Sequence, residues 1–594
     1  MKHSIATRLA DLRALMERQG IAAAIVPQGD PHMSEYLSDH WQLRRWLSGF
    51  TGSAGDLVVT ATRALLWTDS RYFLQAGEQL AGTGIELMKD GLEDTPSIAS
   101  WLCSELSRGQ RVGIDGMTFS AVAAEDLRMR LEADGIVLDA AFDPAAVWHD
   151  RPALPDARIF EHEVRYAGLS AADKMMQVMA GVKARRADSM FISALDEIAW
   201  ILNIRANDVT YNPVVTSFLY LTDCGATLFI DPAKVDDAAA AYLRSQGVDT
   251  LPYSAVKDFL GSLPASARVL VEGGRTAASI VELLGSRAVK AASPVAMLKA
   301  CKNEVQLRGV RDAMVRDGQA MVRSLCEIQT RVAAGERLTE LDVADILRRH
   351  RSASPLFFDE SFGTIAGYGP HGAIVHYEAD ADSASTLEPR GLLLIDSGAQ
   401  YLDGTTDITR TIALGTPTAD ERRDFTLVMK GHIALGAAIF PAGTAGAQLD
   451  ALARQYLWRE GLSYLHGTGH GVGHFLNVHE GPQSIRLNYV PTPLTPGMIT
   501  SNEPGLYREG IHGIRCENLV LTVEAMTTDF GRFLRFETLT LCPFELSLFD
   551  TALMTPAEIE WLNEYHARVR EALAPGLDGE ALRWLEKNTR PLTL

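Results

Sequence analysis

The chain has 594 residues, of which 47% are hydrophobic and 22% are charged, and its formal net charge is −19. These values are typical of globular protein with sizeable cores, and the length predicts about three or four domains. The negative charge argues against a nucleic-acid partner, which needs a basic surface, and is compatible with divalent cations.

The N-terminal segment predicts an amphipathic helix rather than a targeting signal. Charged residues occur throughout it, and Ile5, Leu9, Leu12 and Leu15 recur at helical spacing. No apolar run approaches the ~18 residues that a membrane span needs. The six cysteines are scattered without a CxxC pair, which is typical of reduced thiols. We therefore expect a cytoplasmic protein without a membrane partner.

Two stretches of alternating helix and strand patterns precede residue 297. The first runs to about residue 153, and a Pro-, Asp- and Arg-rich linker at 149–165 separates it from the second. Both give a helix, a strand and then a strand pair, at 7–19, 21–27 and 57–68 in the first stretch and across 171–193 and at 218–231 in the second. This recurrence predicts two duplicated α/β modules; two unrelated α/β domains are the alternative.

A long amphipathic helix predicted at 302–335 opens a third section. Strand patterns beyond it carry nearly all the candidate functional residues. Helices predicted at 555–573 and 578–588 close the chain, and the first of them has proline in its first turn. We expect structural or interfacial roles for these two helices.

Residues 391–414 predict a β-hairpin with an Asp-Gly turn at 403–404. Asp396 ends the apolar run GLLLID, where an unpaired carboxylate is costly unless it meets a cation or hydrogen-bond donors. The predicted register pairs Gln400 with Asp407 and leaves the two aspartates on one face, about 13 Å apart. A shared metal site therefore requires a bulge or a shifted register. A surface hairpin with turn-capping aspartates is the alternative.

Two further carboxylates lie in residues 501–523. Glu503 precedes a Pro-Gly turn, and Arg515 and Glu517 lie on one face of the strand predicted in GIRCENLVL. A glutamate in the middle of such a strand needs a partner. Taken alone, this segment favours an Arg–Glu pair at a strand edge.

The stretch HGTGHGVGHFLNVHEGP (466–482) holds four of the fifteen histidines. A metal-binding helix is excluded, because the glutamate of the HExxH motif is missing and each of the four glycines between 467 and 473 costs about 1 kcal/mol in a helix. In an extended segment, His466, His470 and His474 share a face at intervals of about 13 Å. At most one of them can then bind a given ion, and the glycines opposite allow another backbone to come close.

Four carboxylates and one imidazole form a ligand set that suits Mn²⁺ better than a thiolate-type zinc site. Two ions held by bridging carboxylates lower the pKa of a shared water and polarise a carbonyl, which is hydrolytic chemistry. The sequence has no G-x-S-x-G nucleophile elbow, and GFTGSAG lacks the Lys-Ser/Thr of a phosphate-binding loop.

These motifs together resemble the pita-bread metallopeptidases, and more specifically the Xaa-Pro aminopeptidase (aminopeptidase P) family. The resemblance covers essentially the whole chain and is strongest to the long, three-domain cytosolic form. It is carried by LLLIDSGAQYLDGTTDITRT, HGTGHGVGHFLNVHEGP, SNEPGLY and GIRCENLVL, and outside them by SGFTGSAG, WTDSRYFLQA, SALDEIAWILNIRANDVTYNPV and WLNEYH.

The resemblance implies an α/β (α+β) fold with two creatinase-like N-terminal modules followed by a pita-bread catalytic domain. The expected domains are residues 1–153, 154–297 and 298–594. The family also implies a homodimer.

The family pattern further implies two Mn²⁺ ions, for which Zn²⁺ or Co²⁺ could substitute. Asp407 and Glu517 would bridge the ions, Asp396 would bind one of them, and His470 and Glu503 the other. The implied reaction releases the first residue of peptides with proline in the second position, by attack of a metal-bridging hydroxide on the Xaa-Pro bond.

The remaining roles also follow from the resemblance. Glu503 would accept the proton of the attacking water, His376 would contact the scissile amide, and His479 would stabilise the carbonyl oxygen. His466 would line the same cleft and assist proton transfer. The two arginines expected near substrate are Arg71, from the N-terminal module, and Arg515, which would orient Glu517 or its neighbours. His474 departs from the family pattern, which has a small residue there, and receives no role.

Three other functions compete with this interpretation. Prolidase shares the metal ligands but takes dipeptides. A non-catalytic peptide-binding module and a metal-free creatinase-like hydrolase lose metal ligands, whereas all five are present here.

Overall fold

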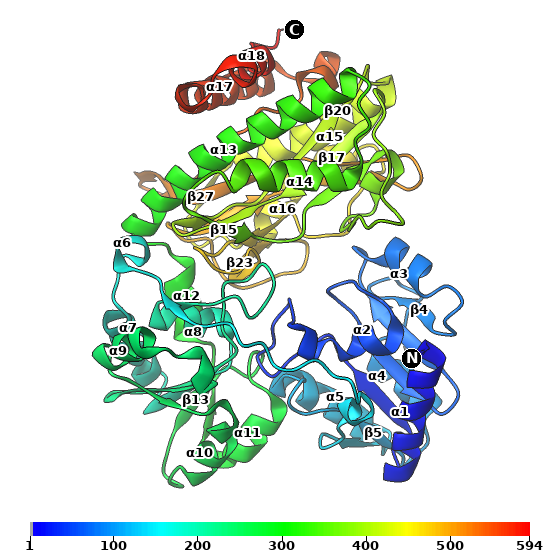
Figure 1. Cartoon of the computed structure of the whole chain (residues 1–594), viewed down its shortest axis with the longest axis vertical. Helices are drawn as coiled ribbons and strands as arrows, with labels where there is room; N and C mark the ends of the chain where they lie inside the picture. Colours follow the sequence, from blue (N-terminus) through cyan, green and yellow to red (C-terminus); the bar gives the residue numbers. More distant parts are fainter. Residues whose placement is uncertain (1–3, 594) are drawn as a thin grey trace. The chain divides into compact units, whose positions relative to one another are not determined.

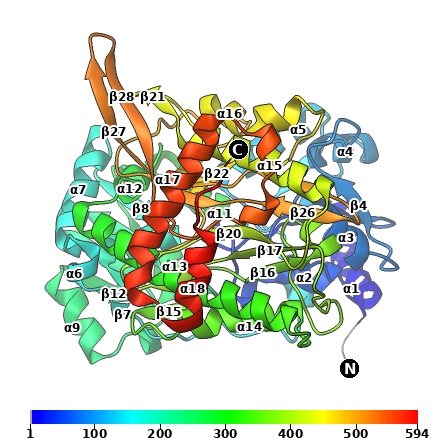
Figure 2. The same ribbon diagram turned by 90° about the horizontal axis from the view of Figure 1, so that it is seen from above.

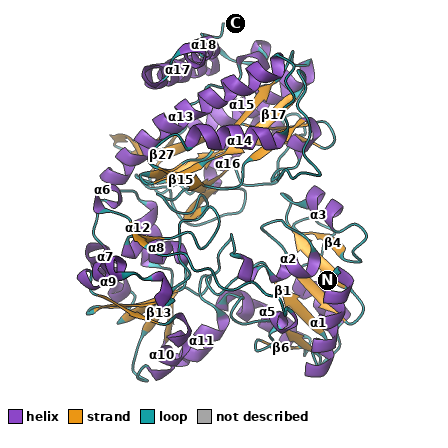
Figure 3. Cartoon of the chain, viewed as in Figure 1, coloured by secondary structure: helices purple, strands orange, loops and turns teal. Residues whose placement is uncertain are grey.

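The computed structural model describes residues 4–593, and the chain divides into two compact units (Figure 1). The first unit comprises Met1–Val164 and Leu169–Val295, and the second comprises Arg165–Gly168 and Ala296–Leu594. Each unit combines helices with strands (Figure 3). Among the described residues, no helix has both the length and the apolar character needed to cross a membrane.

The first unit begins with a six-stranded sheet in the order β4-β3-β2-β1-β5-β6. Its strands are β1 (Ala23–Val26), β2 (Asp56–Thr60), β3 (Ala64–Thr68), β4 (Glu86–Lys89), β5 (Arg111–Gly113) and β6 (Val137–Asp139). Its helices are α1 (Ile5–Gln19), α2 (Leu43–Ser48), α3 (Phe73–Gln79), α4 (Ile98–Glu105) and α5 (Ala121–Ala133). Ala24 and Val26 pack into one hydrophobic core and Ala23 and Ile25 into another, so the sheet is buried on both faces.

A second six-stranded sheet follows in the order β12-β11-β10-β8-β13-β14. Its strands are β8 (Ser189–Ile192), β10 (Phe218–Thr222), β11 (Gly225–Phe229), β12 (Val248–Leu251), β13 (Val269–Val271) and β14 (Ala288–Lys290). The accompanying elements are α7 (Ala171–Ala184), α8 (Leu195–Leu202), α9 (Asp237–Ser245), α10 (Val256–Ser262), α11 (Ala278–Leu284) and the short pair β7 (Phe160–Glu161) and β9 (Ile204–Arg205). The helices α6 (Val164–Ala167) and α12 (Pro294–Ala300) lie where the chain passes between the two units.

The two sheets have the same topology. In the first, β1 lies antiparallel to β2 and parallel to β5, and in the second β8 lies antiparallel to β10 and parallel to β13. Both strand pairs predicted from the sequence, β2–β3 and β10–β11, are antiparallel hairpins. The predicted duplication is therefore confirmed in the fold.

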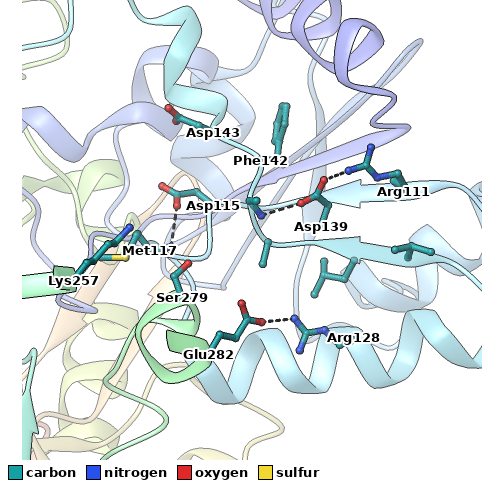
Figure 4. Close-up of a pocket in the computed structure, with 14 residues that line it drawn as sticks. Arg111, Asp115, Met117, Arg128, Asp139, Phe142, Asp143, Lys257, Ser279 and Glu282 are labelled. Atoms are coloured by element: carbon teal, nitrogen blue, oxygen red, sulfur yellow. Dashed lines mark hydrogen bonds and ion pairs between the residues drawn. The ribbon is translucent and has the colours of Figure 1, made fainter. Parts of the chain in front are cut away.

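Backbone hydrogen bonds join the two duplicated modules within the first unit. The Ala121 N–H donates to the Thr276 carbonyl at 2.9 Å, beside the bridge between Ser120 and Ala277. A hollow near this joint is lined by apolar and charged side chains, and four of the charged ones form two ion pairs (Figure 4). Its ion pairs are Arg111–Asp139 and Arg128–Glu282.

The second unit opens with the predicted long helix, α13 (Glu304–Ala333), which begins at a capping box between Asn303 and Gln306. The other helices are α14 (Glu340–Arg351), α15 (Ala419–Gly436), α16 (Ala447–Trp458), α17 (Pro556–Leu573) and α18 (Gly579–Asn588). Leu562 and Val569 of α17 and Leu585 of α18 pack in the same core as Phe425 of α15, so the tail helices are part of the core of the second unit.

Four sheets complete the second unit. The largest has the order β21 (Ile439–Pro441), β28 (Gly531–Thr538), β27 (Asn518–Thr528), β24 (Ile499–Asn502), β22 (Gly469–Gly471) and β23 (Glu480–Ile485). The smaller ones are β16 (Ile365–Tyr368), β17 (Leu392–Ser397) and β20 (Ile408–Ala413); β15 (Phe357–Glu360), β18 (Ala399–Tyr401) and β19 (Gly404–Thr405); and β25 (Gly505–Arg508) with β26 (His512–Arg515). The β27–β28 hairpin extends beyond its sheet (Figure 2).

Candidate metal centre

The aspartate hairpin turns one residue earlier than predicted. Tyr401 pairs with Gly404 and Asp396 pairs with Thr409, so the turn lies at 402–403 and the predicted 403–404 turn is wrong. The Asp-Gly pair predicts the wrong turn because Gly404 packs closely against a helix and does not form the turn. A side chain there would meet the Cα of Val310 in α13 at 3.2 Å, so helix packing rather than turn geometry requires glycine.

The corrected register brings the two aspartates together. Continuing this register places Asp407 opposite Gly398, which directly follows β17 and lies two residues from Asp396, so the separation along the chain falls from the predicted value to about 7 Å. The regular pairing is interrupted at Gly398, where a Cβ atom would lie 2.0 Å from the carbonyl oxygen of Thr406. The shifted register that a shared metal site requires is therefore present.

The strand predicted across Arg515 and Glu517 is broken at that point. β26 ends at Arg515 and β27 begins at Asn518. The Glu517 N–H instead donates to the Thr409 carbonyl at 3.1 Å, which fastens this break to β20. Arg515 pairs with Asp396, with Nη2 2.6 Å from Oδ2, so the predicted Arg515–Glu517 pair is wrong. Arg515 reaches Glu517 through Thr409, whose hydroxyl accepts from Nε of Arg515 and donates to the glutamate at 2.8 Å.

The histidine stretch is extended only at β22, and the predicted row of histidines is wrong beyond Gly471. The chain turns back before β23, so the rings of His470 and His479 pack edge to face with centroids 4.4 Å apart. The predicted close backbone approach is confirmed, because a Cβ at Gly469 would lie 2.0 Å from the Ser501 carbonyl oxygen. His474 is buried, with 2% of its surface exposed.

Three side chains converge closely enough to bind one ion. Ligand atoms of Asp407, His470 and Glu517 all lie within 4.8 Å of one another. Nε2 of His470 lies 3.4 Å from Asp407 Oδ2 and 3.5 Å from Glu503 Oε1. The Nδ1–H of His470 donates to the Gly471 carbonyl at 2.9 Å, because a carbonyl can only accept. Nε2 therefore faces the carboxylates and is the ring nitrogen available to bind a metal ion.

Burial and mutual repulsion of the carboxylates favour positive charge at this site. Burial raises the pKa of Asp396, of Glu517 and of Glu503, the last to about 7, and repulsion among the carboxylates adds to it. Burial alone would lower the pKa of His470, but the hydrogen bond with Asp407 and the charge of Glu503 raise it to about 9. Oδ1 of Asp396 is buried without a hydrogen-bond partner in the described part of the chain. These residues fit hard divalent cations, which would supply the missing contact.

A hydrogen-bonded chain leads from the centre to His466. Nη1 of Arg515 donates to the hydroxyl of Tyr507 at 2.8 Å, and that hydroxyl lies 2.8 Å from Nε2 of His466. Since Nδ1–H of His466 donates to the Gly467 carbonyl, Nε2 is the acceptor, and the chain runs from Arg515 through Tyr507 to His466. Asp396 is at its other end.

Two predicted substrate residues lie outside these contacts. His376 follows the 3-10 turn Gly369–Ala373 and immediately precedes the buried Tyr377. Arg71 belongs to the first unit, where its guanidinium pairs with Asp69 at 2.7 Å. Their roles at the site stay predictions.

Sequence reasoning missed several residues that support the site. Tyr507 and Thr409 carry the hydrogen bonds described above, and Glu340 gathers the loop that holds His376. Glu340 is fully buried and accepts from the backbone N–H of Tyr368 and Ser385, both at 2.7 Å. Thr409 could have been found in the sequence as a polar residue within a strand, in DITRT. Glu340 is the first residue of a helix, and no sequence pattern marks it as a residue that supports the site.

Models of known protein families match most of the chain. Models described as creatinase/prolidase N-terminal domain match residues 8–141 and 150–306. Metallopeptidase family M24 matches residues 308–524, and the C-terminal region of peptidase M24 matches residues 532–592.

Similar proteins extend over the whole chain. "Probable Xaa-Pro aminopeptidase P" of Laccaria bicolor is 42% identical over 99% of this chain and 94% of its own. "Aminopeptidase P2" of Arabidopsis thaliana is 40% identical over 98% of this chain and 88% of its own. The crystal structure of an X-prolyl aminopeptidase from Caenorhabditis elegans, described as a cytosolic enzyme with a di-nuclear active site, superposes with a TM-score of 0.96 at 36% identity. That match covers 99% of this chain and 100% of the other.

Proposed function

The chain belongs to the Xaa-Pro aminopeptidase P family of M24 metallopeptidases, and we propose that it releases the N-terminal residue from peptides with proline in the second position. It is an enzyme, a hydrolase of the aminopeptidase class. The fold expected from the sequence, two creatinase-like modules followed by a pita-bread catalytic domain, is confirmed. The three-domain division 1–153, 154–297 and 298–594 is proposed with it.

The proposal that this centre holds two metal ions rests on the convergence of buried acidic groups around His470. We propose that Asp396, Asp407, His470, Glu503 and Glu517 would hold the ions. The observation that carries this is the buried, unpartnered Oδ1 of Asp396. Mn²⁺ is the proposed ion, because the ligands are four carboxylates and one imidazole.

In the proposed reaction, the nucleophile comes from the metal centre and Glu503 transfers the proton. When bound, two divalent ions supply a hydroxide nucleophile at neutral pH and polarise the substrate carbonyl. Glu503 accepts the proton of the attacking water and returns it to the proline nitrogen as the C–N bond breaks. The products are a free amino acid and a peptide that begins with proline.

Three histidines complete the proposed mechanism. His479, edge-on against His470, stabilises the carbonyl oxygen as it gains negative charge. His376 contacts the scissile amide, and His466 assists proton transfer through the Tyr507 chain. Arg515 positions Asp396, and Arg71 is proposed to contact the substrate from the N-terminal module. Proline itself is selected by its ring, since its amide has no N–H to donate.

Cleavage of matched peptides tests this function. With Mn²⁺ present, the enzyme is expected to release arginine from Arg-Pro-Pro and from longer peptides of the same start, and to leave Arg-Ala-Pro intact. Activity confined to Arg-Pro would show a prolidase instead. If the metal-loaded protein hydrolysed neither Arg-Pro-Pro nor Arg-Pro, a non-catalytic peptide-binding module would be favoured.

We also propose a cytoplasmic homodimer. The support is the family membership and the cytosolic description of the Caenorhabditis elegans relative. Light scattering of the purified protein measures its mass in solution. A mass of 64.7 kDa, that of one chain, would contradict the proposed homodimer.

Glu340→Gln is expected to lower kcat/KM about tenfold while leaving metal content unchanged. Glu340 accepts the hydroxyl of Tyr377 at 2.9 Å and the Nδ1 of His371 at 2.9 Å, and so fixes the segment around His376. A glutamine retains the size but presents an amide NH₂ to donors. Steady-state kinetics and metal analysis of the purified variant measure the effect.

The matched control is Glu336→Gln, because Glu336 pairs with Arg331 on the surface with 53% of its side chain exposed. That variant is expected to keep wild-type kcat/KM. A Glu340→Gln enzyme with lowered thermal stability and wild-type kcat/KM would show that Glu340 only stabilises the fold.

A further inference from the structure

Arg410 of β20 is a buried cation whose partners are all neutral. Its side chain is 1% exposed, and no carboxylate in the described part of the chain forms an ion pair with it. The guanidinium lies over the ring of Phe544, 4.0 Å from its centroid. Burying a charge that only dipoles and a ring stabilise is costly. We therefore expect the role of Arg410 to lie in the segments that its hydrogen bonds join.

One side of the guanidinium holds a proposed metal ligand. Nη1 donates to the carbonyl of Glu517 at 2.5 Å and to the carbonyl of Thr409 at 2.9 Å. Thr409 is the residue whose hydroxyl binds the Glu517 carboxylate. Both the backbone and the side chain of Glu517 are thereby fixed to β20.

The other side of the guanidinium holds the C-terminal region. Nε donates to the carbonyl of Pro543 at 3.1 Å, and Nη2 donates to the carbonyl of Cys542 at 2.8 Å. Nη2 also lies 3.0 Å from the hydroxyl of Tyr565 in α17, which donates to the Cys542 carbonyl at 2.9 Å. The helix α17 thus reaches the metal centre through one side chain.

The same network extends to the second glutamate ligand. Nη2 of Arg410 donates to Oδ1 of Asn518 at 2.8 Å, and Nδ2 of Asn518 lies 3.3 Å from Nε2 of His432. Nδ1 of His432 donates to the Cys516 carbonyl, and its own carbonyl accepts from Asn502 at 2.9 Å. Asn502 directly precedes Glu503.

We propose that Arg410 is a positioning residue through which the C-terminal region, residues 540–566, holds Glu503 and Glu517 in place for metal binding. The inference rests on the proposed function, since it takes these glutamates as ligands. Partners beyond the ligands commonly set metal affinity, and losing one lowers it about 10- to 100-fold. Only arginine presents five donors in a planar fork, so lysine at this position keeps the charge and loses the bridge.

The experiment titrates metal-free protein with Co²⁺, which reports ligand geometry through its visible absorption. Arg410→Lys is expected to weaken Co²⁺ binding about 10- to 100-fold and to change the absorption spectrum. Tyr565→Phe removes one hydroxyl, which accepts from Arg410 and donates to the Cys542 carbonyl, and is expected to weaken binding in the same direction by a smaller factor. Thermal unfolding of the metal-free proteins is measured alongside.

Tyr401→Phe is the matched control. It also removes one buried phenol hydroxyl, which donates to Asp317 at 3.0 Å and touches neither glutamate. Its Co²⁺ affinity and spectrum are expected to equal the wild type.

The outcomes separate the two proposals. Wild-type protein that fails to bind two ions overturns the proposed metal centre. Wild-type binding together with unchanged affinity and spectrum in Arg410→Lys and Tyr565→Phe overturns the positioning role. Where Arg410→Lys does not fold, Tyr565→Phe decides: a weakened affinity supports the role, and an affinity equal to that of Tyr401→Phe refutes it.

Discussion

Asp407→Asn is expected to remove bound metal and to reduce peptide hydrolysis at least about a thousandfold. Asp407 lies within 4.8 Å of both His470 and Glu517 through its ligand atoms, and it is 4% exposed. Replacing one carboxylate oxygen with an amide NH₂ removes a unit of negative charge and one oxygen from the five side chains proposed to hold the ions. Metal analysis of the purified variant and hydrolysis of Arg-Pro-Pro measure both effects.

Asp403→Asn supplies the control on the same hairpin. Asp403 lies at the turn and pairs with Arg316, away from the metal centre. The same change of charge and shape there is expected to leave metal content and hydrolysis at the wild-type level. If Asp407→Asn retained both properties, the dinuclear centre would be wrong, and a binding module or a metal-free hydrolase would have to be reconsidered.

His479→Gln is expected to lower kcat about a hundredfold while the bound metal remains. The ring of His479 packs against that of the proposed ligand His470, with centroids 4.4 Å apart, but His479 is not one of the five proposed ligands. Its proposed contact with the carbonyl oxygen strengthens as that oxygen gains charge, so the loss falls on kcat more than on KM.

The control is His474→Gln in the same stretch. His474 is buried at 2% exposure and has no proposed catalytic or binding role. Its replacement is expected to change thermal stability and to leave kcat of the folded, metal-loaded enzyme near the wild-type value. Equal losses of kcat in the two variants would assign the effect to the fold of this stretch rather than to the His479 side chain.

Local pattern predicted the elements of this protein well. The helix at 302–335 has a capping signal and an apolar stripe that depend only on neighbouring residues, and α13 spans Glu304–Ala333. The duplicated strand pairs were visible for the same reason, since alternation and turn residues are short-range properties. The resemblance of whole motifs then supplied the family and the ligand set, which spacing alone did not.

Register and chain reversal were not available from local pattern. The predicted turn of the aspartate hairpin is one residue out because Gly404 packs against α13 and is not a turn residue. The α13 residues that it contacts lie about ninety positions earlier in the chain. The residues of the histidine stretch predict a row, because nothing in them shows that the chain turns back and packs the ring of His479 against that of His470. Arg515 was assigned to Glu517, its neighbour in sequence, whereas it pairs with Asp396 from another strand.

The sequence by itself therefore determined the α/β fold, the duplication, the family and the residue types of the centre, because these follow from short-range patterns and whole motifs. The tertiary structure alone decided how those residues meet: the two-residue offset between Asp396 and Asp407, the Tyr507 chain, and Arg410 joining Glu517 to α17. Such contacts join segments up to 155 residues apart, and their geometry is set by packing between elements rather than by the residues beside them in the chain.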